Sequence, residues 1–139
     1  LLCIRVMNFS KTTSYAITVL NFLGKHTDKR YSARELNVLL DIPWQYLRQL
    51  LTTLSKDGFI DSAQGRNGGF SLSRDPAKIS IASIVEATEG MSVFNTCIMG
   101  FRECPFDVKC AMHETWEETR ASIIKVLKTT TLDKFRDLD

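Results

Sequence analysis

The sequence predicts a mainly α-helical fold with a small β-hairpin, in which a winged helix-turn-helix domain precedes a long C-terminal dimerisation helix. Apolar residues recur at helical spacing in three short segments before residue 58. A glycine-rich turn between two short extended runs follows at once. A last helical segment is too long and too apolar for one small domain to cover alone.

Start and stop signals mark the first three helices. Residues 10–24 carry apolar side chains at the i, i+3, i+4, i+7 spacing of one buried helix face. Ser32 and Glu35 form a capping box that predicts the start of a second, short helix. Pro43 suits the first turn of a third helix, and Gly58 predicts its end. Three short helices in this order predict a helix-turn-helix unit.

Two extended runs follow the third helix. Residues 59–63 and 70–73 flank a turn, residues 64–69, that is rich in glycine and asparagine. This pattern predicts a β-hairpin. A helix-turn-helix followed directly by a hairpin is the arrangement of a winged helix.

The C-terminal half returns to helical periodicity after an irregular stretch. Ser80 is the predicted cap of a helix that ends near Gly90. Residues 91–110 have little periodicity and predict a loop, and a long helix begins at about Ala111. Because symmetric DNA readers span two half-sites as dimers, we expect a partner subunit to cover this helix.

Composition is that of one ordinary domain. The chain has 139 residues, of which 44% are hydrophobic and 24% charged, with a net charge of +2. The sequence shows neither an apolar run of the roughly 20 residues that a membrane span needs nor the start of a signal peptide. We expect a cytoplasmic protein with no membrane partner. We further expect a DNA-binding domain at 7–78 and a dimerisation region at 79–139.

Polar side chains lie off the leucine face of the third helix. Glutamine and arginine pair bidentately with adenine and guanine edges in the major groove. Arg66 stands between glycines at the tip of the hairpin, where it would enter a minor groove or pair with phosphates. The start of the first helix would hold a phosphate. The alternative for the third helix is a solvated polar face. The predicted DNA-binding residues are Lys11, Thr12, Gln45, Tyr46, Arg48, Gln49, Thr52 and Arg66.

Three of the four cysteines fall close together, in the pattern Cys97-x6-Cys104-x5-Cys110-x2-His113. In a reducing cytosol such a group favours metal or redox chemistry over structural disulfides. Structural zinc usually takes a cysteine pair two to four residues apart, which is absent here. A thiol–disulfide switch would need only two of the cysteines. An iron–sulfur cluster would use all four side chains, in a loop at 91–113.

An enzyme or an electron carrier is a further alternative with little support. The sequence has no phosphate-binding glycine loop ahead of a helix and no evident pair of catalytic carboxylates. His26 and His113 are its only histidines. We expect neither an enzymatic activity nor a small-molecule substrate.

The sequence resembles the BadM/IscR/NsrR family of bacterial winged-helix regulators, from Met7 onward. The resemblance rests on residues 7–11 with Tyr15 and Ala16, on the wing stretch 65–72, and on the three spaced cysteines. It implies a homodimer, a double-stranded DNA operator near target promoters, and a cluster whose state alters the affinity for DNA.

Within the family, the ligand pattern resembles the branch that binds [2Fe–2S] and represses iron–sulfur assembly genes. The resemblance implies that Cys97, Cys104, Cys110 and His113 are the ligands. The nitric-oxide-sensing branch holds [4Fe–4S] with an acidic ligand from the partner's first helix, and Ser14 stands at that position here. The resemblance therefore favours [2Fe–2S] over [4Fe–4S].

Two departures bear on what is sensed and read. The first cysteine spacing is one residue longer than in the assembly-gene regulator. Gln64 and Arg48 stand where that regulator has a wing arginine and a glutamate, so we expect a different operator. We expect a repressor that senses iron–sulfur status or redox and nitrosative stress, with a thiol- or zinc-based regulator as the alternative.

Overall fold

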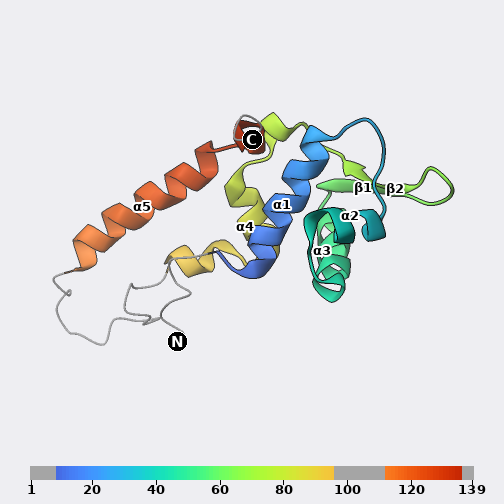
Figure 1. The fold of residues 1–139 in the computed structure, drawn as a ribbon. Helices are drawn as coiled ribbons and strands as arrows, with labels where there is room; N and C mark the ends of the chain where they lie inside the picture. The colour runs from blue at the N-terminus through green and yellow to red at the C-terminus, as the bar shows by residue number, and fades with distance from the viewer. Residues whose placement is uncertain (1–8, 96–111, 136–139) are drawn as a thin grey trace.

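The computed structural model describes residues 9–95 and 112–135, and it confirms a mainly helical fold with one antiparallel hairpin. Figure 1 shows a group of short helices, with the hairpin projecting on one side and α5 extending on the other. Among the described residues, no helix is long and apolar enough to cross a bilayer. The elements in chain order, with η for a 3-10 helix, are α1 (Lys11–Lys25), α2 (Ala33–Leu40), α3 (Trp44–Lys56), β1 (Ile60–Ala63), β2 (Gly69–Leu72), η2 (Pro76–Lys78), α4 (Ile81–Thr88), η3 (Met91–Asn95), α5 (His113–Thr129) and η4 (Leu132–Phe135).

Serine hydroxyls determine where three of the helices begin. The Ser10 side chain accepts a hydrogen bond from the Thr13 amide at the start of α1, over 3.2 Å. At α2, Ser32 and Glu35 form the reciprocal capping box, and Ser80 caps α4. Each cap gives a partner to an amide group that the first helical turn leaves unpaired. The caps predicted at Ser32 and Ser80 are confirmed.

The turn between α2 and α3 depends on two polar residues. Asp41 has a left-handed φ of 52°, a conformation that aspartate tolerates better than most residues. The Asn37 side chain donates a hydrogen bond of 2.6 Å to the Ile42 carbonyl. Pro43 is the N-cap residue of α3, because its ψ of 136° is extended. The sequence predicts Pro43 inside the first turn, so the helix begins one residue later than expected.

The end of α3 is a Schellman motif at Gly58. The Gly58 amide donates to the Ser55 carbonyl over 3.2 Å, and the Phe59 amide donates to the Leu54 carbonyl over 2.9 Å. Gly58 has a φ of +80°, which glycine adopts without strain. The predicted stop is confirmed, and β1 begins two residues later.

The hairpin is anchored to the helices by a backbone bridge. β1 and β2 pair antiparallel, with Ala63 opposite Gly69. Tyr31, from the loop between α1 and α2, exchanges backbone hydrogen bonds of 3.0 and 2.7 Å with Phe70 of β2. The bridge, which sequence reasoning missed, covers an edge of β2 that would otherwise be open to other strands.

One hydrophobic core joins α1, α3 and α4. Leu20, Leu47 and Ile84, one from each helix, are fully buried. Burying a side chain of this size contributes about 1.5–3 kcal/mol. Ile79 is fully buried in the same core, so the packing continues across residue 78. The functional division between 7–78 and 79–139 stays a prediction.

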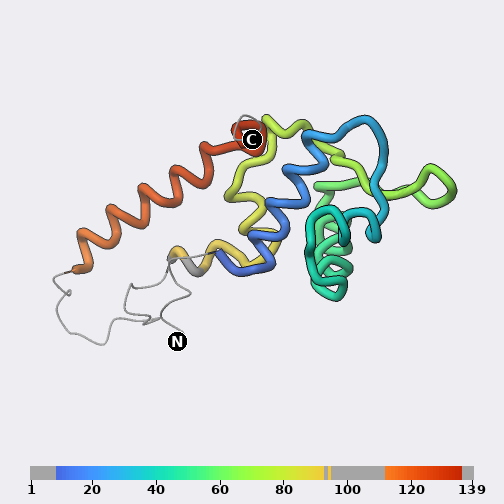
Figure 2. Tube along the Cα trace, viewed as in Figure 1, coloured from blue at the N-terminus to red at the C-terminus, as the bar shows by residue number. Residues whose placement is uncertain are grey.

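The last helix leaves this core and returns to it at one end. Leu127 is the buried residue of α5, whereas the neighbouring Val126 is 59% exposed. After α5 the Leu132 amide donates to the Ile79 carbonyl over 2.8 Å, and η4 packs against α1 and η2. Figure 2 shows α5 extending from this attachment with most of its length away from the other helices.

The predicted loop at 91–110 begins as regular structure. Met91–Asn95 forms a 3-10 helix, which the lack of a 3.6-residue period had hidden. The Met91 amide donates to the Glu86 carboxylate over 2.9 Å. Residues 96–111 lie outside the described part of the chain.

Replacing Gly69 with alanine should destabilise the fold. Gly69 has a φ of +135°, and an added Cβ would lie 2.7 Å from the backbone carbonyl carbon and oxygen of Tyr31. We expect Gly69→Ala to lower the free energy of unfolding by about 2–3 kcal/mol in urea denaturation. The control is Gly65→Ala, which also has positive φ, at +101°, but no atom within 4 Å of the added Cβ. Equal losses in the two variants would show that the contact with Tyr31 adds nothing.

Candidate nucleic-acid interface

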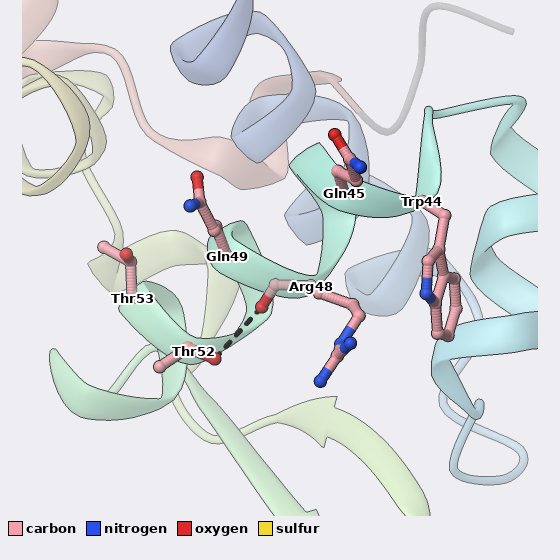
Figure 3. A pocket seen from close by; sticks show the side chains of 6 residues that line it. All are labelled: Trp44, Gln45, Arg48, Gln49, Thr52 and Thr53. Carbon is pink, nitrogen blue, oxygen red and sulfur yellow. Dashed lines mark hydrogen bonds between the residues drawn. The ribbon is translucent and has the colours of Figure 1, made fainter.

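The exposed face of α3 carries the side chains predicted to touch DNA. The four leucines of α3 are buried on the opposite face, because residues three or four positions apart share one side of a helix. Polar residues therefore face outward around a shallow depression of about 620 Å³. Figure 3 shows the side chains that line it, which are Trp44, Gln45, Arg48, Gln49, Thr52 and Thr53.

Two kinds of side chain stand on this face. Gln45 and Gln49 lie one turn apart, and their amides extend in the same direction (Figure 3). The guanidinium of Arg48 lies on the Trp44 side of the helix. The Thr52 hydroxyl donates to the Arg48 carbonyl over 3.0 Å, as threonines in helices often do. Four of the predicted residues are therefore together on one exposed surface.

The wing places Arg66 at an exposed tip. The Gly68 amide donates to the Gly65 carbonyl over 3.0 Å and closes a tight turn around Arg66 and Asn67. Both residues in the turn are exposed. Figure 1 shows the connection between β1 and β2 reaching beyond the helices. This position matches the prediction of a cation at the end of a projecting hairpin.

The start of α1 lies beside the start of α3. Lys11 is exposed and Thr12 half-buried in the first turn of α1. One turn later, Tyr15 packs edge-on against Tyr46 of α3, with 5.9 Å between ring centroids. Tyr46 therefore stands at the border of the α3 face, next to the predicted phosphate position on α1.

A carboxylate that sequence reasoning missed sits at the start of α1. Glu89, the residue after α4, accepts a hydrogen bond of 2.9 Å from the Ser10 amide. The fully buried hydroxyl of Thr13 donates to the same carboxylate and also contacts the Thr88 hydroxyl. A negative charge at the positive end of a helix dipole is stabilising. Glu89 joins α1 to α4, and it also places a negative charge beside the predicted phosphate position.

Charged groups also support the loop before α2. Lys29 Nζ lies 2.7 Å from Glu35 Oε2. This hydrogen bond raises the pKa of Lys29 and lowers the pKa of Glu35. Burial raises the pKa of Tyr31, and the hydrogen bond from its hydroxyl to Asp28 raises it further. These contacts hold the loop that bridges to β2.

The histidine of the predicted metal site begins α5. His113 Nε2 lies 3.0 Å from Glu117 Oε1, and both side chains are partly exposed. Cys97, Cys104 and Cys110 lie outside the described residues. Among the residues that the structure describes, no three His, Cys, Asp or Glu side chains form a group that would hold a metal ion. Ser14, the position compared with the acidic ligand, is exposed on α1.

Sequence reasoning also missed three residues around the wing and α3. Trp44 lies one turn before Arg48, and this i, i+4 spacing was the signal that would have paired them. Arg74 donates to the Asp57 carbonyl over 2.9 Å, and Arg30 donates to the Asp61 carbonyl over 3.3 Å. Neither arginine contact follows a local spacing rule, because each joins residues far apart in the sequence.

Comparison with known proteins points to transcription regulators. The model of the family described as "Rrf2: Iron-dependent Transcriptional regulator" matches residues 9–137. A putative HTH-type transcriptional regulator from Aquifex aeolicus is 33% identical, over 91% of this chain and 89% of its own length. The regulator NsrR of Geobacillus kaustophilus is 29% identical, over 91% and 87%. The regulator IscR of Vibrio vulnificus is 28% identical, over 91% and 75%.

A solved structure extends the similarity to the fold. CymR, the global cysteine regulator of B. subtilis, superposes with a TM-score of 0.81 at 25% sequence identity. The match covers 96% of this chain and 98% of CymR. The predicted winged-helix fold and the predicted kinship with bacterial regulators are confirmed. These relatives are regulators and not enzymes, as expected for this chain.

Removing the Glu89 carboxylate should loosen the start of α1. We expect Glu89→Ala to lower the free energy of unfolding by about 1–3 kcal/mol, because two donors lose a charged acceptor and one of them is buried. Chemical denaturation measures the change. Glu118→Ala, on the exposed side of α5, is the control and should change stability by less than about 0.5 kcal/mol. Similar values for both variants would contradict a structural role for Glu89.

Proposed function

Because this chain belongs to the Rrf2 family of transcriptional regulators, we propose that it is a homodimeric repressor that binds a double-stranded DNA operator through α3 and the wing. The observation that carries the proposal is the polar face of α3, which the buried leucines turn outward beside a projecting hairpin. A helix of this kind fits the major groove of B-DNA. In this proposal, residues 7–78 bind DNA and residues 79–139 form the dimer.

Each predicted contact has a separate task. Gln45 and Gln49 would pair with adenine edges, and Arg48 with guanine. Phosphate contacts position the protein along the duplex without reading its sequence. The proposed phosphate and groove contacts come from three elements: Lys11 and Thr12 on α1, Tyr46 and Thr52 on α3, and Arg66 on the wing.

The exposed surface of α5 supports the dimer. Val126 is largely exposed, and Trp116, Ile123 and Ile124 are only half-buried along the same helix. An apolar helix surface of this length is costly to leave in water. A second copy of α5 would cover it, and the two-fold pairing would place two α3 helices for two half-sites.

We further propose that Cys97, Cys104, Cys110 and His113 hold an iron–sulfur cluster, with [2Fe–2S] favoured. The donor set fits, because thiolates and imidazole are the side chains that bind such clusters. At His113, the Glu117 carboxylate pairs with Nε2 and leaves Nδ1 as the available ring nitrogen. A carboxylate partner on the other nitrogen is typical of metal-binding histidines. When bound, the cluster would supply a redox-sensitive group next to α5.

A thiol-based sensor is the second candidate. The solved structure of CymR, a global cysteine regulator, is similar to this chain over almost its whole length. Two of the three neighbouring cysteines would then form a disulfide under oxidation, and His113 would take no part. Iron and sulfide content separates the two candidates.

DNA binding should lose one charge contact when Arg66 is removed. We expect Arg66→Ala to reduce the slope of log affinity against log salt concentration by about 0.9, the value for one phosphate contact. Fluorescence anisotropy with a duplex selected from random sequence measures the slope. Lys128→Ala on α5 is the control and should leave it unchanged. A slope that Arg66→Ala does not alter would remove the wing from the interface.

Anaerobic purification tests the cluster. We expect about two iron and two sulfide per chain, with visible absorption that Cys104→Ala and His113→Ala reduce. Cys3 lies outside the motif, so the Cys3→Ala variant should retain the cluster. Loss of the cluster should change operator affinity by roughly 5- to 150-fold. About four of each would favour [4Fe–4S] instead. Zinc alone, or no metal after reconstitution, would rule out the iron–sulfur proposal.

A further inference from the structure

A groove separates α3 from the hairpin on the side of the predicted interface. It holds about 370 Å³ and is open to solvent. Its lining includes Trp44, Arg48 and Thr52 of α3, with Ser62 and Phe70 of the hairpin. Arg48 is the one charged residue among the described residues that line it. A groove with a single cation and no carboxylate attracts an electronegative group.

The Arg48 guanidinium rests beside an aromatic ring. Its central carbon lies 6.0 Å from the centroid of the Trp44 ring, one helical turn earlier. Figure 3 shows the two side chains lying side by side on the same edge of α3. Trp44 is 39% exposed, although a large aromatic residue gains most by burial. A partly exposed aromatic ring attracts a planar guanidinium through cation–π and stacking interactions.

The hydrogen-bonding groups of Arg48 are not used within the described part of the protein. Its guanidinium makes no ion pair and donates no hydrogen bond there. The Thr52 hydroxyl donates to the backbone carbonyl of Arg48 and leaves the guanidinium free of hydrogen bonds among the described residues. Arg30 and Arg74 differ, because each donates to a backbone carbonyl near the wing. Arg48 therefore presents a charged, planar donor whose orientation the neighbouring ring restricts.

We propose that Trp44 is a positioning residue that makes Arg48 select guanine at one position of each half-site. The ring would restrict the guanidinium to the wing side of α3, where Arg48 and Trp44 both line the groove. Guanine offers two acceptors, O6 and N7, at the matching spacing in the major groove. Residues in the N-terminal part of a recognition helix contact base edges, and Trp44 and Arg48 occupy that part. The inference rests on the proposed function and adds Trp44 as the residue that orients Arg48 for its contact with guanine.

The test compares base preference among variants of the intact chain. Duplexes selected from random sequence by the wild type define its preferred site, and single-base variants of that site give the preference at each position. We expect replacement of one guanine to weaken wild-type binding by roughly 5- to 150-fold. Arg48→Ala should abolish this preference. Trp44→Ala should reduce it several-fold, and Trp44→Phe, which keeps an aromatic face, should restore most of it.

Lys56→Ala is the matched control, because Lys56 is an exposed cation at the end of α3 without an aromatic neighbour one turn before it. It should leave the preference for guanine unchanged. If Arg48→Ala does the same, Arg48 contacts phosphate and the inference is wrong. A guanine preference that survives Trp44→Ala in a folded variant would also overturn it. A wild type with no preference among duplexes would overturn the proposed function as well, so the two failures are distinguishable.

Discussion

The packing of the α3 leucines against α1 and α4 determines which side of α3 meets solvent. Because a helix rotates about 100° per residue, burying those four positions fixes the direction in which the other side chains of α3 face. Gln45, Arg48 and Gln49 face outward for this reason, and no separate contact is needed to turn them. The same core includes Ile84 of α4, so the helix that leads toward the cysteine segment shares its packing with the helix proposed to read DNA.

Glu89 gives this arrangement a second point of attachment. Its carboxylate joins the end of α4 to the first turn of α1, where Thr13 is fully buried. The Tyr15–Tyr46 contact then continues from α1 to α3. The elements at the predicted interface are thus connected through side chains that touch one another, and the charge of Glu89 also limits where a phosphate would approach α1.

Local rules predicted most of the helix boundaries, because a cap or a stop depends on residues within one turn. The Ser32 capping box and the Gly58 stop are examples. The Tyr31 bridge to Phe70 and the Glu89 contact with Ser10 were beyond such rules, since each joins segments far apart in the sequence.

The outward face of α3 followed from its leucine spacing. The i, i+4 spacing of Trp44 and Arg48 is a local signal that predicts their contact. The cysteine pattern predicts ligand chemistry without fixing the shape of the loop.

The Schellman turn at Gly58 joins α3 to β1 without a linker, and the Tyr31 bridge holds the other strand. α3 and the hairpin are therefore joined directly, and in the proposed complex they would approach DNA as one unit. In the proposed dimer, a signal that arises near α5 would act on the distance and angle between two such units. The spacing between the two half-sites would then matter as much for operator binding as their base sequences.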